Sequence, residues 1–99
     1  MNHALTTALL KASLMLNQPW LDHSGIDMVP EVGIFDCGGV QAHGCFTVTM
    51  VDGRQRGIMR INLSGPYRQA LAHESIHAVR WLSGESDWYR HDKLTRGAR

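Results

Sequence analysis

The chain has 99 residues and a formal net charge of +1. This length fits one compact domain, residues 1–99, so any active site must be built on a minimal scaffold. The balanced charge does not favour a nucleic-acid or membrane partner, and no apolar run approaches the ~20 residues that cross a bilayer. Two cysteines, Cys37 and Cys45, are too few to staple a secreted scaffold. We therefore expect a soluble, cytoplasmic protein.

The first third of the chain predicts a helix and then a loop. Apolar side chains recur at roughly helical spacing between residues 2 and 17, and Pro19 prevents their continuation. Residues 20–30 mix Asp, Gly, Ser and Pro with scattered apolar residues, a composition typical of a connecting loop.

The middle third predicts a sheet. Three short segments, residues 32–35, 46–51 and 58–63, are rich in β-branched or apolar residues and are separated by glycines. Asp52-Gly53 lies between the last two segments and is a strong tight-turn signal. We expect these two strands to form an antiparallel hairpin.

The last third predicts two helices. The Ser-Gly-Pro tract at residues 64–66 supplies a capping hydroxyl and a proline suited to the first turn of a helix that runs to about Leu82. Residues 85–96 begin with acidic and end with basic side chains, an order that suits the dipole of a last helix. The predicted fold is therefore α+β: an N-terminal helix, a three-stranded mainly antiparallel sheet, a long helix and a C-terminal helix.

The sequence His-Glu-Ser-Ile-His at residues 73–77 lies on the long predicted helix. Positions i and i+4 share a helical face, so His73 and His77 can present two nitrogens to one zinc ion at about 2.0 to 2.1 Å each. Glu74 then lies beside the metal, where it can accept a proton from a zinc-bound water as a general base. Chance spacing of two histidines on a solvated helix is the plain alternative, but the motif is rare enough to favour Zn²⁺ binding.

A catalytic zinc ion normally takes three protein ligands, so a third must follow the helix. The candidates are Glu85, Asp87, His91 and Asp92. If the Ser-Gly pair at 83–84 is the turn of a helical hairpin, the residue level with His77 is His91, and neutral imidazole suits zinc better than a solvated carboxylate. We expect His91 as the third ligand, with Glu85 as the second choice.

These segments resemble a known family. Ile-Met-Arg-Ile-Asn-Leu-Ser at residues 58–64, Leu-Ala-His-Glu-Ser-Ile-His-Ala at 71–78, and His91 are similar to the SprT-like (Spartan-like) zinc metallopeptidase domain. That family pairs an I-x-I-x strand with an H-E-x-x-H helix and takes its third ligand from a later histidine. The likeness covers roughly the last half of the chain.

The resemblance implies a minimal zincin-like peptidase in which His73, His77 and His91 hold zinc and Glu74 is the catalytic base. It also implies that a protein or peptide substrate binds in extended form along the strand before the active helix, the one that ends near Asn62. Two other classes stay open: a catalytically inactive zinc-binding module with a regulatory or protein-binding role, and a metallohydrolase that acts on another kind of carbonyl. The oligomeric state cannot be predicted.

Weaker features have ordinary explanations. Tyr67 and Tyr89 flank the motif and could stabilise an oxyanion, but such tyrosines more often pack with an exposed hydroxyl. Cys37 and Cys45 cluster with His43 around glycines, yet the spacing matches no compact zinc site, and buried cysteines commonly act as small apolar residues.

Overall fold

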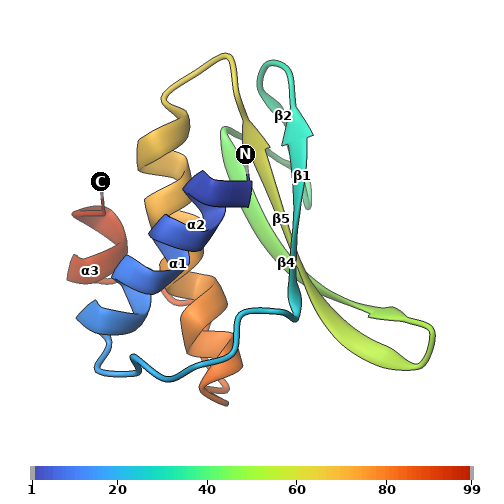
Figure 1. Ribbon diagram of the computed structural model, residues 1–99. Helices are drawn as coiled ribbons and strands as arrows, with labels where there is room; N and C mark the ends of the chain where they lie inside the picture. Colours follow the sequence, from blue (N-terminus) through green and yellow to red (C-terminus); the bar gives the residue numbers. More distant parts are fainter. Residues whose placement is uncertain (1, 99) are drawn as a thin grey trace.

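The computed structural model describes residues 2–98. The elements in chain order are α1 (Asn2–Met15), β1 (Ile26–Glu31), β2 (Phe35–Cys37), β3 (Val40–Ala42), β4 (Gly44–Val51), β5 (Arg54–Asn62), α2 (Tyr67–Leu82) and α3 (Lys93–Arg96). The helices lie on one side of a twisted sheet, so the predicted α+β class is confirmed (Figure 1). No helix within residues 2–98 combines the length and the apolar character that a membrane crossing requires.

The β4–β5 pair is the predicted antiparallel hairpin. Its turn residues Asp52 and Gly53 have φ angles of 50° and 79°, the positive values that a tight hairpin turn of this kind requires at both positions. The sheet also contains β1, which pairs with β5 in parallel, so the strand order is β1-β5-β4. The sheet is therefore mixed, and β5 is its central strand.

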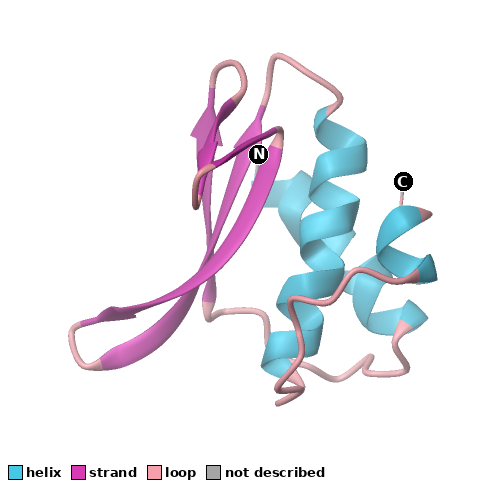
Figure 2. Ribbon diagram, turned by 180° about the vertical axis from the view of Figure 1, so that it is seen from behind, coloured by secondary structure: helices cyan, strands magenta, loops and turns pink. Residues whose placement is uncertain are grey.

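The hydrophobic core lies between α2 and the sheet. Ile76 and Val79 of α2 are fully buried with Met59 and Ile61 of β5. The helices α1 and α3 pack on α2, so α2 is the central element of the helical layer, as seen from behind in Figure 2. The His-Glu-Ser-Ile-His motif therefore lies on α2, which packs against the sheet and against the two other helices.

Two predictions for the middle of the chain were wrong. The segment 20–30, predicted as a loop, contains most of β1, whose hydrogen-bonding partner lies about thirty positions later in β5. The segment 32–35, predicted as a strand, is largely a bend in which Val32 is 92 % exposed and Ile34 57 % exposed. These apolar residues connect β1 to β2 and do not enter the core.

A small hairpin of β2 and β3 lies over the sheet face opposite α2. Arg60 of β5, whose neighbours Met59 and Ile61 point into the core, packs its guanidinium on the Phe35 ring, 4.3 Å from the centroid. A disulfide between Cys37 and Cys45 ties the same hairpin to β4. The pairing corrects the expectation that the two cysteines serve as separate apolar residues.

The helix ends also differ from expectation. The hydroxyl of Ser64 does not cap α2; it donates to the side chain of Asn62, and Pro66 occupies the N-cap position. Only residues 93–96 of the predicted last helix are helical. Residues 85–92 form a segment of turns and irregular backbone, in which the Arg90 side chain donates hydrogen bonds to the carboxylates of Glu85 and Asp87.

Candidate metal centre

Three histidines converge beside α2 and line the same cleft. His73 and His77 lie one turn apart on α2, and His91 reaches them from the irregular segment before α3. The ring centroids form a nearly equilateral triangle with sides of 4.9, 5.1 and 5.0 Å, and the nearest ligand nitrogens all lie within 4.8 Å of one another. The structure thus brings together the three histidines that the sequence singled out. Which metal they suit depends on the protonation of the rings and on the spacing of their nitrogens.

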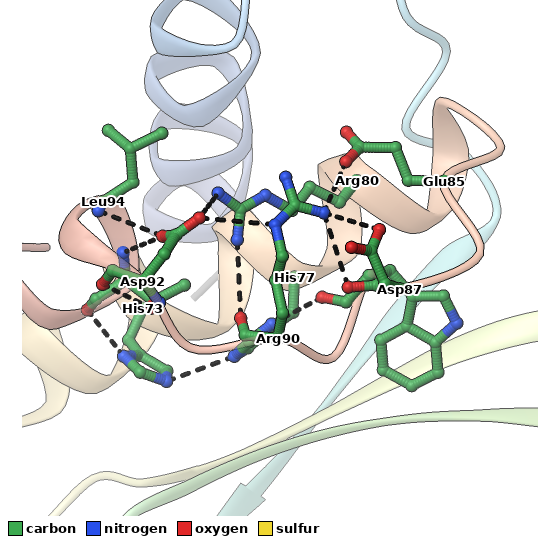
Figure 3. Close-up of polar contacts among 10 residues, drawn as sticks. His73, His77, Arg80, Glu85, Asp87, Arg90, Asp92 and Leu94 are labelled. Carbon is green, nitrogen blue, oxygen red and sulfur yellow. Dashed lines mark hydrogen bonds and ion pairs between the residues drawn. The ribbon is translucent and has the colours of Figure 1, made fainter.

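The other candidate third ligands point elsewhere. Glu85 and Asp87 each accept a hydrogen bond from Arg90 at 2.7 Å, and Asp92 accepts one from Arg80 at 2.6 Å (Figure 3). This arrangement agrees with the preference for His91 over Glu85, but not with the helical hairpin on which that preference was based. His91 lies on an irregular segment and not on the second arm of a helical hairpin.

Backbone carbonyls fix the orientation of two of the rings. His73 Nδ1 lies 2.8 Å from the Thr95 carbonyl oxygen and His77 Nδ1 lies 2.7 Å from that of Trp88, so both Nδ1 atoms carry the proton and donate it (Figure 3). The two Nε2 atoms are then left with free lone pairs, 3.2 Å apart. Two acceptors do not bond each other, but a separation of about 3.3 Å is what two nitrogens on one tetrahedral zinc ion require.

The electrostatic setting keeps these rings neutral. Burial lowers the pKa of His77 to about 4, against the opposing effect of its hydrogen bond to Trp88. Burial also lowers the pKa of His73, and the nearby His91 adds to that effect. At neutral pH both imidazoles therefore offer lone pairs, which is the form that binds metal. The donor set, its protonation and its spacing all fit a divalent cation such as zinc.

Glu74 lies at the edge of the histidine cluster. Its Oε2 is 4.0 Å from His73 Nε2, and the side chain is 10 % exposed. Burial raises the pKa of Glu74 to about 7, although a hydrogen bond from the Phe46 N–H of β4 acts in the opposite direction. A carboxylate with a pKa near neutrality can both accept and return a proton, so its position and its environment suit a general base.

The cluster forms one wall of a cleft of about 370 Å³. Val40 and Ala42 of β3, Gly44 of β4, and Trp88 and Tyr89 also line this cleft. A larger groove of about 710 Å³ runs between α1 and α2, but it contains none of the histidine cluster or Glu74. The chemistry therefore assigns the site to the smaller cleft.

The two tyrosines that flank the motif in the sequence line different cavities. Tyr89 lines the cleft and is 63 % exposed, whereas Tyr67 lines the groove beside α1. Trp81 and Trp88 pack on the buried ring of Phe46, with ring centroids 5.9 and 5.5 Å away.

The backbone that holds the third histidine could not be predicted from the sequence. Residues 88–95, called the ligand segment below, carry His91 and supply both carbonyls that orient the other two rings. Arg80, only 1 % exposed, anchors this segment to α2. The sequence places Arg80 on the same helical face as the motif, but only the structure shows that it is buried, where an arginine needs a partner.

Comparisons with protein-family models, with curated proteins and with solved structures gave no match to this chain. The resemblance to the SprT-like domain thus stays a prediction from the motif residues. What the structure establishes is a small α+β domain with a mixed sheet and three histidines placed to hold one metal ion.

Proposed function

We propose that the protein is a zinc-dependent metallopeptidase of minimal zincin-like form. The observation that carries the proposal is the convergence of His73, His77 and His91 beside the buried carboxylate of Glu74. A three-histidine donor set with an adjacent carboxylate is the pattern of a hydrolytic zinc site, in contrast to the four closed protein ligands of a structural one. The neutral rings of His73 and His77 favour zinc over the oxygen-preferring cations.

The roles of the residues follow from their positions. When bound, zinc would supply the positive charge that lowers the pKa of a water molecule and polarises a substrate carbonyl. Glu74 would take the proton from the attacking water and transfer it to the nitrogen of the breaking amide bond. The Thr95 and Trp88 carbonyls keep the His73 and His77 rings in the tautomer that binds metal.

The substrate would pair with β4. The strand ending near Asn62, to which the resemblance assigned this role, is β5, and both of its edges are occupied by β1 and β4. Within residues 2–98, the outer edge of β4 pairs with no other strand, and this edge borders the cleft. An extended peptide can add to a free strand edge through main-chain hydrogen bonds with little demand on its side chains.

The ladder pattern shows which groups of β4 point outward. The Asn62 N–H donates to the His43 carbonyl, so odd-numbered positions of β4 bond to β5 and even-numbered positions face away. The Gly57 N–H, opposite Val48, accordingly donates to Gly25 on the β1 side. Val48 therefore presents its N–H and carbonyl to the open edge, next to the Phe46 N–H that Glu74 engages.

The test compares metal content and peptide cleavage in the wild-type protein and in Glu74→Gln. The purified proteins are loaded with Zn²⁺, dialysed, measured by elemental analysis and incubated with a degenerate library of unstructured peptides whose fragments are read by mass spectrometry. We expect one zinc per chain in both proteins and cleavage by the wild type alone. His73→Ala, which removes a ligand, should lose both metal and cleavage.

Two other results would each have a clear meaning. A wild-type protein that retains no zinc would overturn the proposal completely. Retained zinc without cleavage of any peptide would overturn the peptidase assignment and favour the metal-binding module without catalysis.

A further inference from the structure

Arg80 lies on the same face of α2 as His73 and His77, one turn further on. Its side chain is only 1 % exposed, and its Nη2 donates to Asp92 Oδ2 at 2.6 Å while its Nη1 lies 3.4 Å from the Arg90 carbonyl oxygen (Figure 3). These two acceptors belong to the residues immediately before and after His91. The guanidinium thus holds the backbone on both sides of the third histidine.

His91 needs such support because its own side chain provides little. It is exposed, whereas His77 is 5 % exposed and His73 is half-buried. The segment that carries it is irregular, so no helix or strand ladder fixes its backbone. The position of His91 therefore depends on the anchors at either side of it.

Asp92 extends the same anchor to a second ligand. Its Oδ1 accepts hydrogen bonds from the N–H groups of Leu94 and Thr95. The Asp92 N–H in turn donates to the Thr95 hydroxyl oxygen, which completes a capping box at the start of α3. That cap positions the Thr95 carbonyl, which accepts a hydrogen bond from the Nδ1–H of His73. One carboxylate thus connects Arg80 to the surroundings of two of the three histidines.

We propose that the ion pair between the buried Arg80 and the partly exposed Asp92 is the positioning device of the metal site, holding His91 in reach of the metal and His73 in its ligand tautomer through Thr95. This inference rests on the metal binding proposed above. A role in stability alone explains the pair poorly, because taking the Arg80 guanidinium out of water is costly and a carboxylate partner that is 37 % exposed offsets only part of that cost. The Nε of Arg80 also has no hydrogen-bond partner within residues 2–98, a further cost that an apolar side chain would avoid.

The test measures metal affinity directly. Co²⁺ serves as a spectroscopic substitute for Zn²⁺, because its visible absorption reports the number and geometry of its ligands, and Zn²⁺ affinity follows from competition with a chromophoric chelator. We expect Arg80→Met and Asp92→Asn each to weaken binding by ~10–100-fold and to change the Co²⁺ spectrum. Asp92→Asn keeps an oxygen for the cap, so it tests the pair even if Arg80→Met fails to fold.

Arg56→Met is the matched control. Arg56 forms the same kind of pair with Asp27, at 2.7 Å, but between β5 and β1 and with 33 % of its side chain exposed. Loss of this surface pair should leave metal affinity within about twofold of the wild type. Arg80→Lys, which restores the charge without the two-pronged geometry, should recover part of the affinity.

A double-mutant cycle with His91→Ala separates positioning from general loosening. If Arg80 acts partly through His91, the losses of affinity in the two single variants should be less than additive in the double variant, because the part that acts through the lost ligand cannot be lost twice. Unchanged affinity and spectrum in both Arg80→Met and Asp92→Asn, or full additivity with His91→Ala, would overturn the inference while leaving the metal site in place. A wild-type protein that binds neither Co²⁺ nor Zn²⁺ would overturn the site itself.

Discussion

Gly44 lies directly against Glu74. A Cβ at position 44 would be 3.0 Å from Cγ and 3.1 Å from Oε2 of Glu74, and 3.2 Å from the Cβ of Ala70. The absence of a side chain at this position of β4 therefore lets the strand edge approach the carboxylate, whose hydrogen-bond donor is Phe46 on the same strand. The first residue of β4 is as much a part of the site as the helix motif.

We predict that Gly44→Ala displaces the Glu74 carboxylate while the three histidines keep their places. Zinc content should be unchanged, and peptide cleavage should fall by ~10–100-fold, since small displacements of a catalytic group are costly. Overpacking should also lower the free energy of unfolding by roughly 1–3 kcal/mol, measured by urea denaturation. Gly25→Ala is the control, because its added methyl meets only a Leu82 methyl group, at 3.9 Å. Equal cleavage by Gly44→Ala and the wild type would contradict the assigned position of Glu74.

Zinc should stabilise the fold through His91. At a free Zn²⁺ concentration of ~1,000 times the Kd, binding to the native state adds about 4 kcal/mol, which for a domain of this size raises the Tm by well over ~10 °C. His91→Ala should lose most of that increase yet leave the Tm in EDTA within about 2 °C of the wild type, because the side chain is exposed. Differential scanning fluorimetry with and without Zn²⁺ measures both quantities. A zinc-dependent increase that survives His91→Ala intact would exclude His91 as a ligand.

Val48→Pro should impair substrate binding without disturbing the sheet. The Val48 N–H faces the open edge of β4, and proline is tolerated on edge strands where no ladder bond is lost. We predict a several-fold higher KM for peptide cleavage, with unchanged zinc content and little change in kcat. Val48→Ala removes the side chain but keeps the N–H, so it should cleave like the wild type. If both variants behave alike, the peptide does not pair with this edge.

The Cys37–Cys45 disulfide should contribute to stability but not to metal binding. It closes a short loop, with a sequence separation of 8, for which the lost chain entropy of the unfolded state corresponds to about 2–3 kcal/mol. The double variant Cys37→Ser/Cys45→Ser should show that loss in urea denaturation, with zinc affinity kept because the proposed ligands lie on α2 and the ligand segment. An unchanged denaturation midpoint would show that the cross-link does not constrain the unfolded chain.

The α2 helix and the β4–β5 hairpin, which depend on neighbouring residues, were predicted correctly from the sequence. The pairing of segments that lie far apart in the chain was not. The α2 helix and the β4–β5 hairpin are determined by apolar spacing and by the Asp52-Gly53 turn, which are properties of neighbouring residues. The β1 strand has an unfavourable sequence, Ile-Asp-Met-Val-Pro-Glu, and owes its structure to parallel pairing with β5 far along the chain. Pro30 is compatible with this strand because β1 is at the edge of the sheet.

The sequence predicted which histidines come together, but not the backbone carbonyls and the arginine that hold them in place. The helical period places His73, Glu74 and His77 together in any helix, and chemistry alone favours His91 over the acidic candidates. The carbonyls that orient the rings come from the backbone, whose course through the ligand segment no side-chain pattern specifies. The burial of Arg80 likewise becomes visible only once that segment is seen to cover it.

The ligand segment supports the proposed metal site in two ways, through His91 and through the carbonyls that orient the other two histidines. If residues 88–95 detach, His91 leaves the site, and in the same event the rings of His73 and His77 lose the carbonyls that hold their protons on Nδ1. If the proposed site binds metal, its affinity would also depend on how firmly residues 88–95 dock, and a partner or protease that pulls this segment away would weaken all three ligands together.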